Sequence, residues 1–275
     1  MTKLAKLFDE QWMQTAQTAT SESWACEVLS SLDGDGGMYL CQLRTWFNGY
    51  PLRSTPKQHL RKRLESFKND EHLGAVNELA WWALMRRQAL IGEPISTSGE
   101  PSPDFKLESP FQGYIEVSTL NPSFADSECW QTYTSVDLQA ANSETLKRIA
   151  SLTTEPKKKL KQLKYAARQE RPCILALFDY TTWSGFGTEF FRQLGEFLLG
   201  KEFGFKSLPN ELSALVYLER RVMDGWNVLS HVRSAVYYNP LAKFPITVGI
   251  LPCFSQFATG LTVTEPNTTE HWLPL

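Results

Sequence analysis

A strong helical pattern lies between residues 71 and 91. Asp70 precedes it as a predicted N-cap, Glu71 suits the first turn, and Gly92 is a predicted stop. Residues 3–31 also show a helical pattern, so the N-terminal part of the chain is predicted to be mainly helical. Two polar breaks interrupt this part of the chain, at 33–37 and at 48–56.

After residue 92 the pattern changes to short extended runs. Residues 103–107 and 114–119 are predicted strands, joined by a turn that contains Pro110 and Gly113. The continuous apolar run from Cys173 to Phe178 predicts a strand that is buried on both faces. The other predicted elements are a polar loop at 121–142, a helix at 155–169 opened by Thr154 and Pro156, a helix at 188–199, and strands at 212–218, 232–238 and 246–251.

This order of elements predicts an α/β fold. Residues 1–70 are expected to form an N-terminal helical extension, and residues 71–275 an α/β domain with C-terminal additions. With 275 residues, the chain is long enough for one large domain or two small ones.

The composition is that of a soluble globular protein with a large core, because 42% of residues are apolar and 21% are charged. The net charge of −2 gives no overall basic excess, so any contact with nucleic acid must come from local basic stripes. Five scattered cysteines without a CxxC pair, and four isolated histidines, disfavour a disulfide framework, a zinc knuckle and imidazole-based catalysis.

No membrane segment is expected. The longest apolar runs fall well short of the ~20 residues needed to cross a bilayer, and the N-terminus lacks the apolar stretch of a signal peptide. The sequence therefore predicts a cytoplasmic protein without membrane contact.

Glu78 is a chemically informative residue of the predicted helix 71–91. Its neighbours at i+3, i+4 and i+7 are Trp81, Trp82 and Met85, with Gly74 and Ala75 one turn before. A carboxylate in these surroundings is expected to be buried, and it then needs a metal ion, a cation or several hydrogen-bond donors. The alternative is a partly exposed Glu on a helix that packs on several sides.

Asp104 and Glu116 form a second group. A hairpin of this length places them at one end of a sheet, and the two-residue period puts Glu116 and Ser118 on one face. Two carboxylates from adjacent strands suit Mg²⁺ or Mn²⁺. Alternatively, Pro103-Asp104 only starts a turn and Glu116 lies on a solvated face.

The predicted helix 155–169 carries a basic flank. Lys159 falls outside this flank, at the edge of the apolar stripe, with Gln162 one turn later, so Lys159 is the lysine expected to reach inward. The alternative is that Lys159 extends along the helix side to solvent. The flank consists of Lys157, Lys161, Lys164 and Arg168. These residues, and the basic segment 57–68, either contact phosphates or form solvated helix faces.

The order of these motifs resembles the PD-(D/E)XK nuclease superfamily, which includes restriction endonucleases, resolvases and many bacterial defence nucleases. Glu78 on a helix, Pro103-Asp104-Phe105 on a strand and Ile115-Glu116-Val117-Ser118 on the next strand carry the resemblance. Lys159-Leu160-Lys161-Gln162 and the strand 173–178 are similar to the helix and strand that complete this core. The resemblance covers about residues 71–180 and implies a restriction-endonuclease-like mixed sheet flanked by helices.

The resemblance implies metal-dependent hydrolysis of phosphodiester bonds. Asp104 and Glu116 would hold Mg²⁺ (or Mn²⁺), with the Val117 carbonyl as a further candidate ligand, and Glu78 would bind a second ion or orient a water. Lys159 would stabilise the nucleophile or the transition state, with Gln162 orienting it. DNA is the expected nucleic-acid partner, and bacterial defence is the implied setting. A homodimer and a protein partner in a defence complex stay open.

The chain departs from the family pattern at Ser118, where the motif has a lysine two residues after the second acid. A serine hydroxyl cannot supply the positive charge of that lysine. Some members bring an equivalent lysine from the following helix, and Lys159 is the candidate here. If Lys159 does not reach the site, the core is a catalytically inactive module that binds nucleic acid or a protein partner. A scaffold whose aromatic-rich C-terminal part docks a larger assembly is a further alternative.

Overall fold

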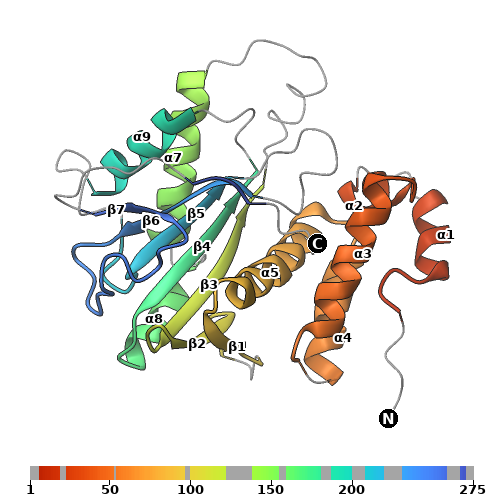
Figure 1. Cartoon of the computed structure of the whole chain (residues 1–275), viewed down its shortest axis with the longest axis horizontal. Helices are drawn as coiled ribbons and strands as arrows, with labels where there is room; N and C mark the ends of the chain where they lie inside the picture. Colours follow the sequence, from red (N-terminus) through yellow and green to blue (C-terminus); the bar gives the residue numbers. More distant parts are fainter. Residues whose placement is uncertain are drawn as a thin grey trace.

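The computed structural model of the protein has a mixed β-sheet flanked by helices on both faces (Figure 1). It describes residues 6–18, 23–52, 54–96, 100–121, 138–154, 159–180, 187–199, 208–219, 231–258 and 267–270. The described helices are α1 (Glu10–Thr18), α2 (Trp24–Leu29), α3 (Asp35–Gly49), α4 (Ser54–Leu64), α5 (Asn69–Arg87), α7 (Leu138–Thr154), α8 (Leu160–Arg168) and α9 (Gly187–Leu199). The described strands are β1 (Ile91–Pro94), β2 (Phe105–Ser109), β3 (Gly113–Leu120), β4 (Cys173–Asp179), β5 (Ala214–Glu219), β6 (His231–Tyr238), β7 (Ser255–Phe257) and β8 (Asn267–Glu270).

The strands follow the order β1-β2-β3-β4-β5-β6-β7, and β8 also pairs with β6. The central strands β3, β4 and β5 are parallel to one another, whereas β1 and β2 form an antiparallel edge and β6 is antiparallel to β5. The parallel strands β4 and β5 are buried along their whole length, as expected for strands covered on both faces. The general prediction of an α/β protein is therefore confirmed.

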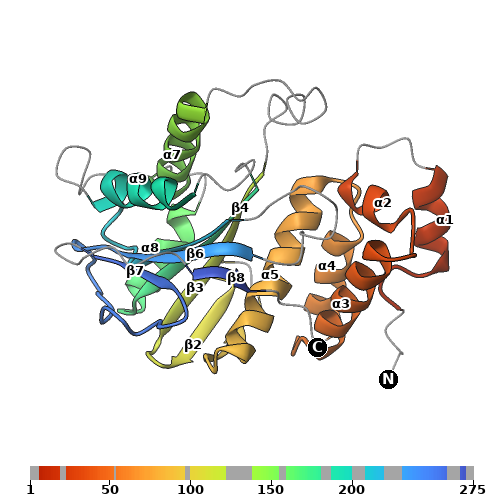
Figure 2. The same cartoon turned by 45° about the horizontal axis from the view of Figure 1, so that its top comes forward.

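The two faces of the sheet bury separate hydrophobic clusters. Ile115, Val117 and Val216 pack on the face covered by α5 and, behind it, by α3 and α4 (Figure 2). Leu175 and Leu215 pack on the opposite face, together with apolar residues of α7, α8 and α9. Alternation along β3 consequently places odd-numbered residues toward α5 and even-numbered residues toward α8.

Helix α5 is apolar on nearly all sides because it lies between the sheet and the N-terminal helices. Its buried residues include Leu73, Val76, Leu79, Trp81 and Leu84. The cluster around α5 continues without a break into α3 and α4, so the N-terminal helices and the sheet share one core. The division into an extension at 1–70 and a domain at 71–275 stays a prediction.

The predicted bounds of the helix 71–91 are wrong at its end, and Asp70, the predicted N-cap, lies in the first turn of the helix. Helix α5 begins at Asn69 after the N-cap Lys68, ends at Arg87, and is followed by strand β1. Gly92 lies in β1 beside a break in register, where a Cβ would come within 2.6 Å of the Lys106 carbonyl oxygen. This glycine is therefore explained by close backbone packing between two strands and not by a helix stop.

Other predicted boundaries also change. Thr154 ends α7 instead of opening a helix, and the predicted polar loop 121–142 contains the start of α7 at Leu138. Residues 246–251 form turns and not a strand. The helical prediction for 3–31 is interrupted before Glu10 and at Ser23, and α3 begins inside the predicted break 33–37. These boundaries depend on tertiary packing, which local pattern does not record.

Within the described ranges, no helix has both the length and the apolar character needed to span a bilayer.

Candidate active site

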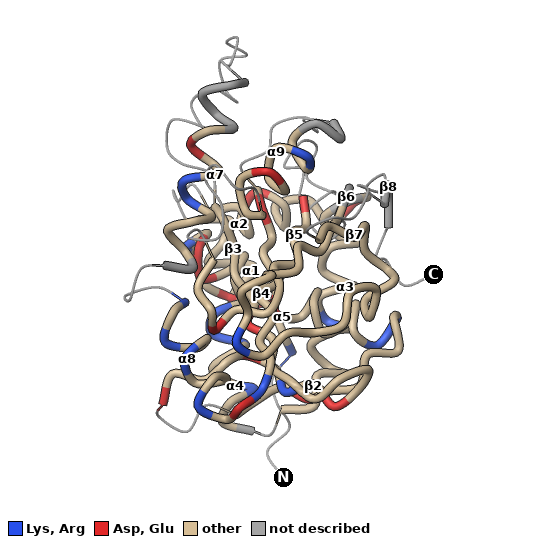
Figure 3. Tube along the Cα trace, turned by 90° about the vertical axis from the view of Figure 1, so that its left-hand side faces the viewer, with Lys and Arg blue, Asp and Glu red and all other residues tan. Residues whose placement is uncertain are grey.

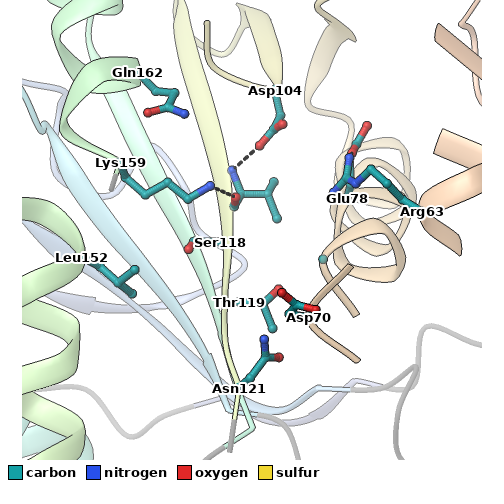
Figure 4. Close-up of a pocket in the computed structure, with 12 residues that line it drawn as sticks. Arg63, Asp70, Glu78, Asp104, Ser118, Thr119, Asn121, Leu152, Lys159 and Gln162 are labelled. Atoms are coloured by element: carbon teal, nitrogen blue, oxygen red, sulfur yellow. Dashed lines mark hydrogen bonds and ion pairs between the residues drawn. The ribbon is translucent and has the colours of Figure 1, made fainter. Parts of the chain in front are cut away.

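A cavity of about 540 Å³ opens where strand β3 extends beyond its neighbour β2 (Figure 4). Its walls come from α4 and α5 on one side and from α7 and α8 on the other, and residues of β3 lie between them. The last β2–β3 pair is Phe105 with Ile115, so the following residues of β3, which pair with β4 on one edge, have this opening on the other edge in place of β2. The cavity therefore exposes strand backbone together with polar side chains from both faces of the sheet.

Asp104 directly precedes the first residue of β2. Its side-chain Oδ2 accepts a hydrogen bond of 2.7 Å from the Val117 backbone N–H, and its carbonyl accepts one of 2.8 Å from Ile95. Pro103 precedes it and has no N–H to continue the ladder. Asp104 is thereby fixed just before the start of β2, with its carboxylate at the cavity.

Glu116 and Lys159 meet on the α8 side of the sheet. Lys159 Nζ donates to Glu116 Oε1 at 2.5 Å and to the Val117 carbonyl at 3.1 Å. Lys159 is the N-cap residue of α8, and its backbone N–H donates to the Leu152 carbonyl at the end of α7. The expectation that Lys159 reaches inward is confirmed in its geometry.

Glu116 is deeply buried, with only 2% of its surface exposed, so the alternative of a solvated face is wrong. Its Oε2 atom is also buried and has no hydrogen-bond partner among the described residues. An unpartnered buried carboxylate oxygen is costly, and a cation or a donor at this position would offset that cost.

The electrostatics of the pair follow from burial. Burial, with the nearby charge of Asp104, raises the pKa of the Glu116 carboxyl to about 8, although Lys159 opposes this shift. Burial alone lowers the pKa of the Lys159 ammonium, but the charges of Glu116 and Asp104 outweigh it and the net pKa is raised. Lys159 therefore stays charged. Glu116 keeps its proton up to a pH well above that at which an exposed carboxyl loses its proton.

Glu78 lies on the other face of the sheet, on α5. Tyr50 donates to Glu78 Oε1 at 2.7 Å, and Arg63 Nη1 donates to Glu78 Oε2 at 2.7 Å. The expectation of a buried carboxylate supplied with a cation and a donor is confirmed. Burial, followed by the charge of Asp104, raises the pKa of Glu78, and Arg63 and Tyr50 counter that shift.

The three predicted metal ligands do not form one cluster. Among the residues that the structure describes, no three His, Cys, Asp or Glu side chains gather closely enough to hold an ion. Both Glu78 oxygens already accept hydrogen bonds, whereas Glu116 Oε2 accepts none from the part of the chain that the structure describes. Of the predicted set, Asp104 and Glu116 are thus the better candidates for one site, and the Val117 carbonyl already accepts from Lys159.

The remaining predicted residues are distributed along α8. Gln162 lines the cavity, and its Oε1 has no partner among the described residues. Lys161 and Lys164 are exposed, and exposed Arg168 lies 3.9 Å from Glu100. Figure 3 shows Lys and Arg along α8. Lys157 lies outside the described residues.

Sequence reasoning missed the contribution of the N-terminal helices. Arg63 was assigned only to a basic segment, and Tyr50 was assigned no role, although together they bind Glu78. The basic segment 57–68 is also less available than expected, since Lys57 and Arg61 are engaged within the protein. The only local signal was the need of Glu78 for a cation, which does not say where that cation comes from.

Comparisons of the chain with protein-family models, with curated proteins and with solved structures find no match. Its function is therefore inferred from the geometry of the site.

Proposed function

We propose that the protein is a metal-dependent nuclease that hydrolyses phosphodiester bonds, with DNA as its first expected substrate. One observation carries the proposal: the Lys159 ammonium binds the buried Glu116 and the Val117 carbonyl, while Asp104, which lines the same open cavity as Lys159, binds the N–H of that same Val117. Two acids and an ammonium from neighbouring elements are the groups that the PD-(D/E)XK resemblance requires.

The order of elements supports a restriction-endonuclease-like core as part of the proposal. Helix α5 precedes the antiparallel strands β1, β2 and β3, and α8 then leads into β4, which is parallel to β3. Lys159, at the start of α8, donates to the carbonyl of Val117. The next residue, Ser118, occupies the position at which the family has its lysine. A bacterial defence role rests on the family resemblance alone.

The residues fit a divalent cation held by few protein ligands. Mg²⁺ is commonly held by one or two carboxylates and retains several waters. Asp104 and the unpartnered oxygen of Glu116 are suitable ligands, and Glu116 must release its proton when it binds a cation. When bound, such an ion supplies charge stabilisation to the phosphate.

The chain itself contributes positioning and charge. The Val117 N–H orients the Asp104 carboxylate, and Lys159 places a permanent positive charge beside the position of the phosphate. Gln162 faces the same cavity and orients groups around Lys159. The exposed lysines of α8 lie on the adjacent surface, where they can contact phosphates further along a strand.

A cleavage assay tests the proposal. Plasmid and single-stranded DNA are incubated with the parent protein and Mg²⁺ or Mn²⁺, and with Asp104→Asn, Glu116→Gln and Lys159→Met. Each variant should lose at least about a hundredfold in rate, since removal of one preorganised charged group commonly costs that much. Lys243→Met is the control, because it removes an exposed lysine that does not line the cavity. Activity that survives the Asp104 and Glu116 changes would refute the proposal.

Moving the ammonium tests whether Lys159 replaces the motif lysine. Ser118 lies two residues after Glu116, on the same face of β3, and lines the cavity. The double variant Lys159→Met/Ser118→Lys should recover part of the cleavage that Lys159→Met loses. Lys159→Met/Ser118→Met is its control and should stay inactive. Equal activity of the two double variants would contradict this role of Lys159.

A second candidate is a catalytically silent nuclease fold that binds nucleic acid or a protein. The observation that favours it is the direct pair between Lys159 and Glu116, which gives one oxygen of the acid a partner without any metal. Parent protein that binds DNA but cleaves neither substrate with Mg²⁺ or Mn²⁺ would support this alternative.

A further inference from the structure

A second cation lies across the cavity from Lys159. Arg63 comes from α4 in the N-terminal part of the chain and lines the cavity together with Asp104 and Lys159 (Figure 4). Its side chain is 45% exposed, yet its guanidinium is anchored at 2.7 Å to the buried carboxylate of Glu78. Arg63 is therefore held in place and also reachable from solvent.

The anchor of Arg63 is rigid. The Tyr50 hydroxyl donates to the other oxygen of Glu78, and Tyr50 is itself almost completely buried. Burial and the charge of Glu78 hold the pKa of Tyr50 well above its usual range, so the hydroxyl keeps the proton that it donates. Each Glu78 oxygen thus has a fixed partner, which fixes the direction of the guanidinium.

Arg63 has N–H donors that the contact with Glu78 does not use, and its side chain is partly exposed to solvent. A guanidinium carries five N–H donors, and the contact with Glu78 involves Nη1. Gly74 lies one turn before Glu78, and a Cβ at that position would come within 3.4 Å of Arg63 Nη2. The Nη2 side of the guanidinium thus lies beside the smallest residue of α5, and a planar fork of N–H donors suits phosphate oxygens.

We propose that Arg63 forms a phosphate-binding subsite that holds a phosphodiester of a nucleic-acid strand lying across the open edge of β3, with Glu78 as its positioning residue. The identity of the ligand rests on the proposed function. Asp70, Glu78 and Asp104 also line the cavity and repel an anion, so a phosphate there needs the nearby positive charge of the guanidinium. Lys159 Nζ already donates to Glu116 and to the Val117 carbonyl, whereas the Arg63 guanidinium uses one nitrogen for Glu78 and keeps more donors for an incoming phosphate.

The subsite makes a specific prediction for binding. Fluorescein-labelled single-stranded and duplex DNA oligonucleotides are titrated in EDTA at several KCl concentrations, so that binding is measured without cleavage. Arg63→Met should raise Kd about tenfold or more, because a charge-assisted contact is lost. It should also reduce the slope of log K against log salt by about 0.7–0.9, the value for one phosphate contact.

Lys62→Met is the matched control, because it removes one exposed positive charge from the neighbouring position of α4, outside the cavity. Its Kd and salt slope should stay close to those of the parent. Arg63→Met leaves Glu78 buried without its cation, so Arg63→Met/Glu78→Gln is measured as well and should show the same loss of affinity and slope. Thermal unfolding establishes that each variant is folded.

Unchanged affinity and salt slope in folded Arg63→Met or in the double variant would overturn the subsite, and so would a parent protein that binds neither oligonucleotide. The result is separable from that of the cleavage assay. If the parent cleaves DNA and the Arg63→Met variant cleaves it equally well, the subsite alone is refuted. Loss of binding in Arg63→Met, combined with full cleavage by Asp104→Asn and Glu116→Gln, refutes the proposed catalytic acids alone.

Discussion

Glu116 holds the most unusual carboxyl of the site. It is buried, Lys159 binds one of its oxygens, and the other oxygen lacks a partner among the described residues. Burial and Asp104 together raise its pKa to about 8. A proton and a cation therefore compete for the same carboxylate, so cation binding at this residue should strengthen as pH rises.

The raised pKa of Glu116 predicts a pH-dependent free energy of unfolding. Between its ordinary pKa of 4.5 and about 8, the folded state holds a proton that the unfolded state has released. The free energy of unfolding contributed by this group therefore falls as pH rises through that window. Lys159 does not add to this change, because its raised pKa keeps it charged in both states.

Glu116→Gln should remove this pH dependence. Urea unfolding of parent and variant at intervals from about pH 5 to about pH 8 measures the difference, which should shift steadily in favour of the variant as pH rises. Glu144→Gln, at an exposed position of α7, is the control and should follow the parent. Parallel pH curves for the parent and Glu116→Gln would contradict the raised pKa.

At the level of elements, the site depends on how α5 docks on the sheet. Asn77 on α5 donates to Thr119 Oγ1 of β3 at 2.8 Å and accepts from the Tyr180 hydroxyl, which follows β4, at 3.0 Å. Asn77 is fully buried and directly precedes Glu78. These two hydrogen bonds fix α5 against β3 and β4, and so they fix the wall that carries Glu78 and Arg63.

Asn77→Ala should lower the free energy of unfolding by about 2 kcal/mol, because the buried hydroxyl of Tyr180 and the partly buried hydroxyl of Thr119 each lose a partner. It should also weaken DNA binding, since the Glu78–Arg63 pair is no longer held in register with β3. Urea unfolding and oligonucleotide binding measure the two effects. Asn48→Ala, at an exposed position of α3, is the control. A variant as stable as the parent would show that this contact does not hold α5 in place.

For the whole molecule, the important feature is the continuous core between the N-terminal helices and the sheet. Leu43 of α3 is fully buried in the same cluster as Leu79 of α5 and Val216 of β5. Arg63 also belongs to this N-terminal part, and it reaches the cavity beside β3. Both packing and site geometry therefore couple residues 1–70 to the rest of the chain.

Leu43→Ala should destabilise the whole molecule and not only the N-terminal helices. The expected loss is about 2–5 kcal/mol, the usual cost of truncating a buried leucine. Tryptophan fluorescence and far-UV circular dichroism should report one coincident urea transition in the parent and in the variant. Leu32→Ala, at a residue that is 48% exposed, is the control. A separate early transition in the variant would show that the predicted division at residue 70 separates two independently folding units.

Several features were determined by the sequence alone, because they depend on neighbours within a few positions. The apolar run 173–178 predicted the buried strand β4, and helical spacing placed Glu78 among large apolar residues on α5. Alternation put Glu116 and Ser118 on one face of β3, and the edge of an apolar stripe singled out Lys159. Each pattern reflects which side of an element is buried, which is a local property of that element.

Tertiary structure alone decided which distant groups meet. It placed Glu78 and Glu116 on opposite faces of the sheet, supplied Arg63 as the cation for Glu78, and put Gly92 in a strand instead of at a helix end. A buried carboxylate needs a cation or a hydrogen-bond donor as its partner, but the sequence does not indicate which cation of the chain that is. The choice depends on how helices and sheet pack in three dimensions, since only packing brings residues 15 or more positions apart within hydrogen-bond distance.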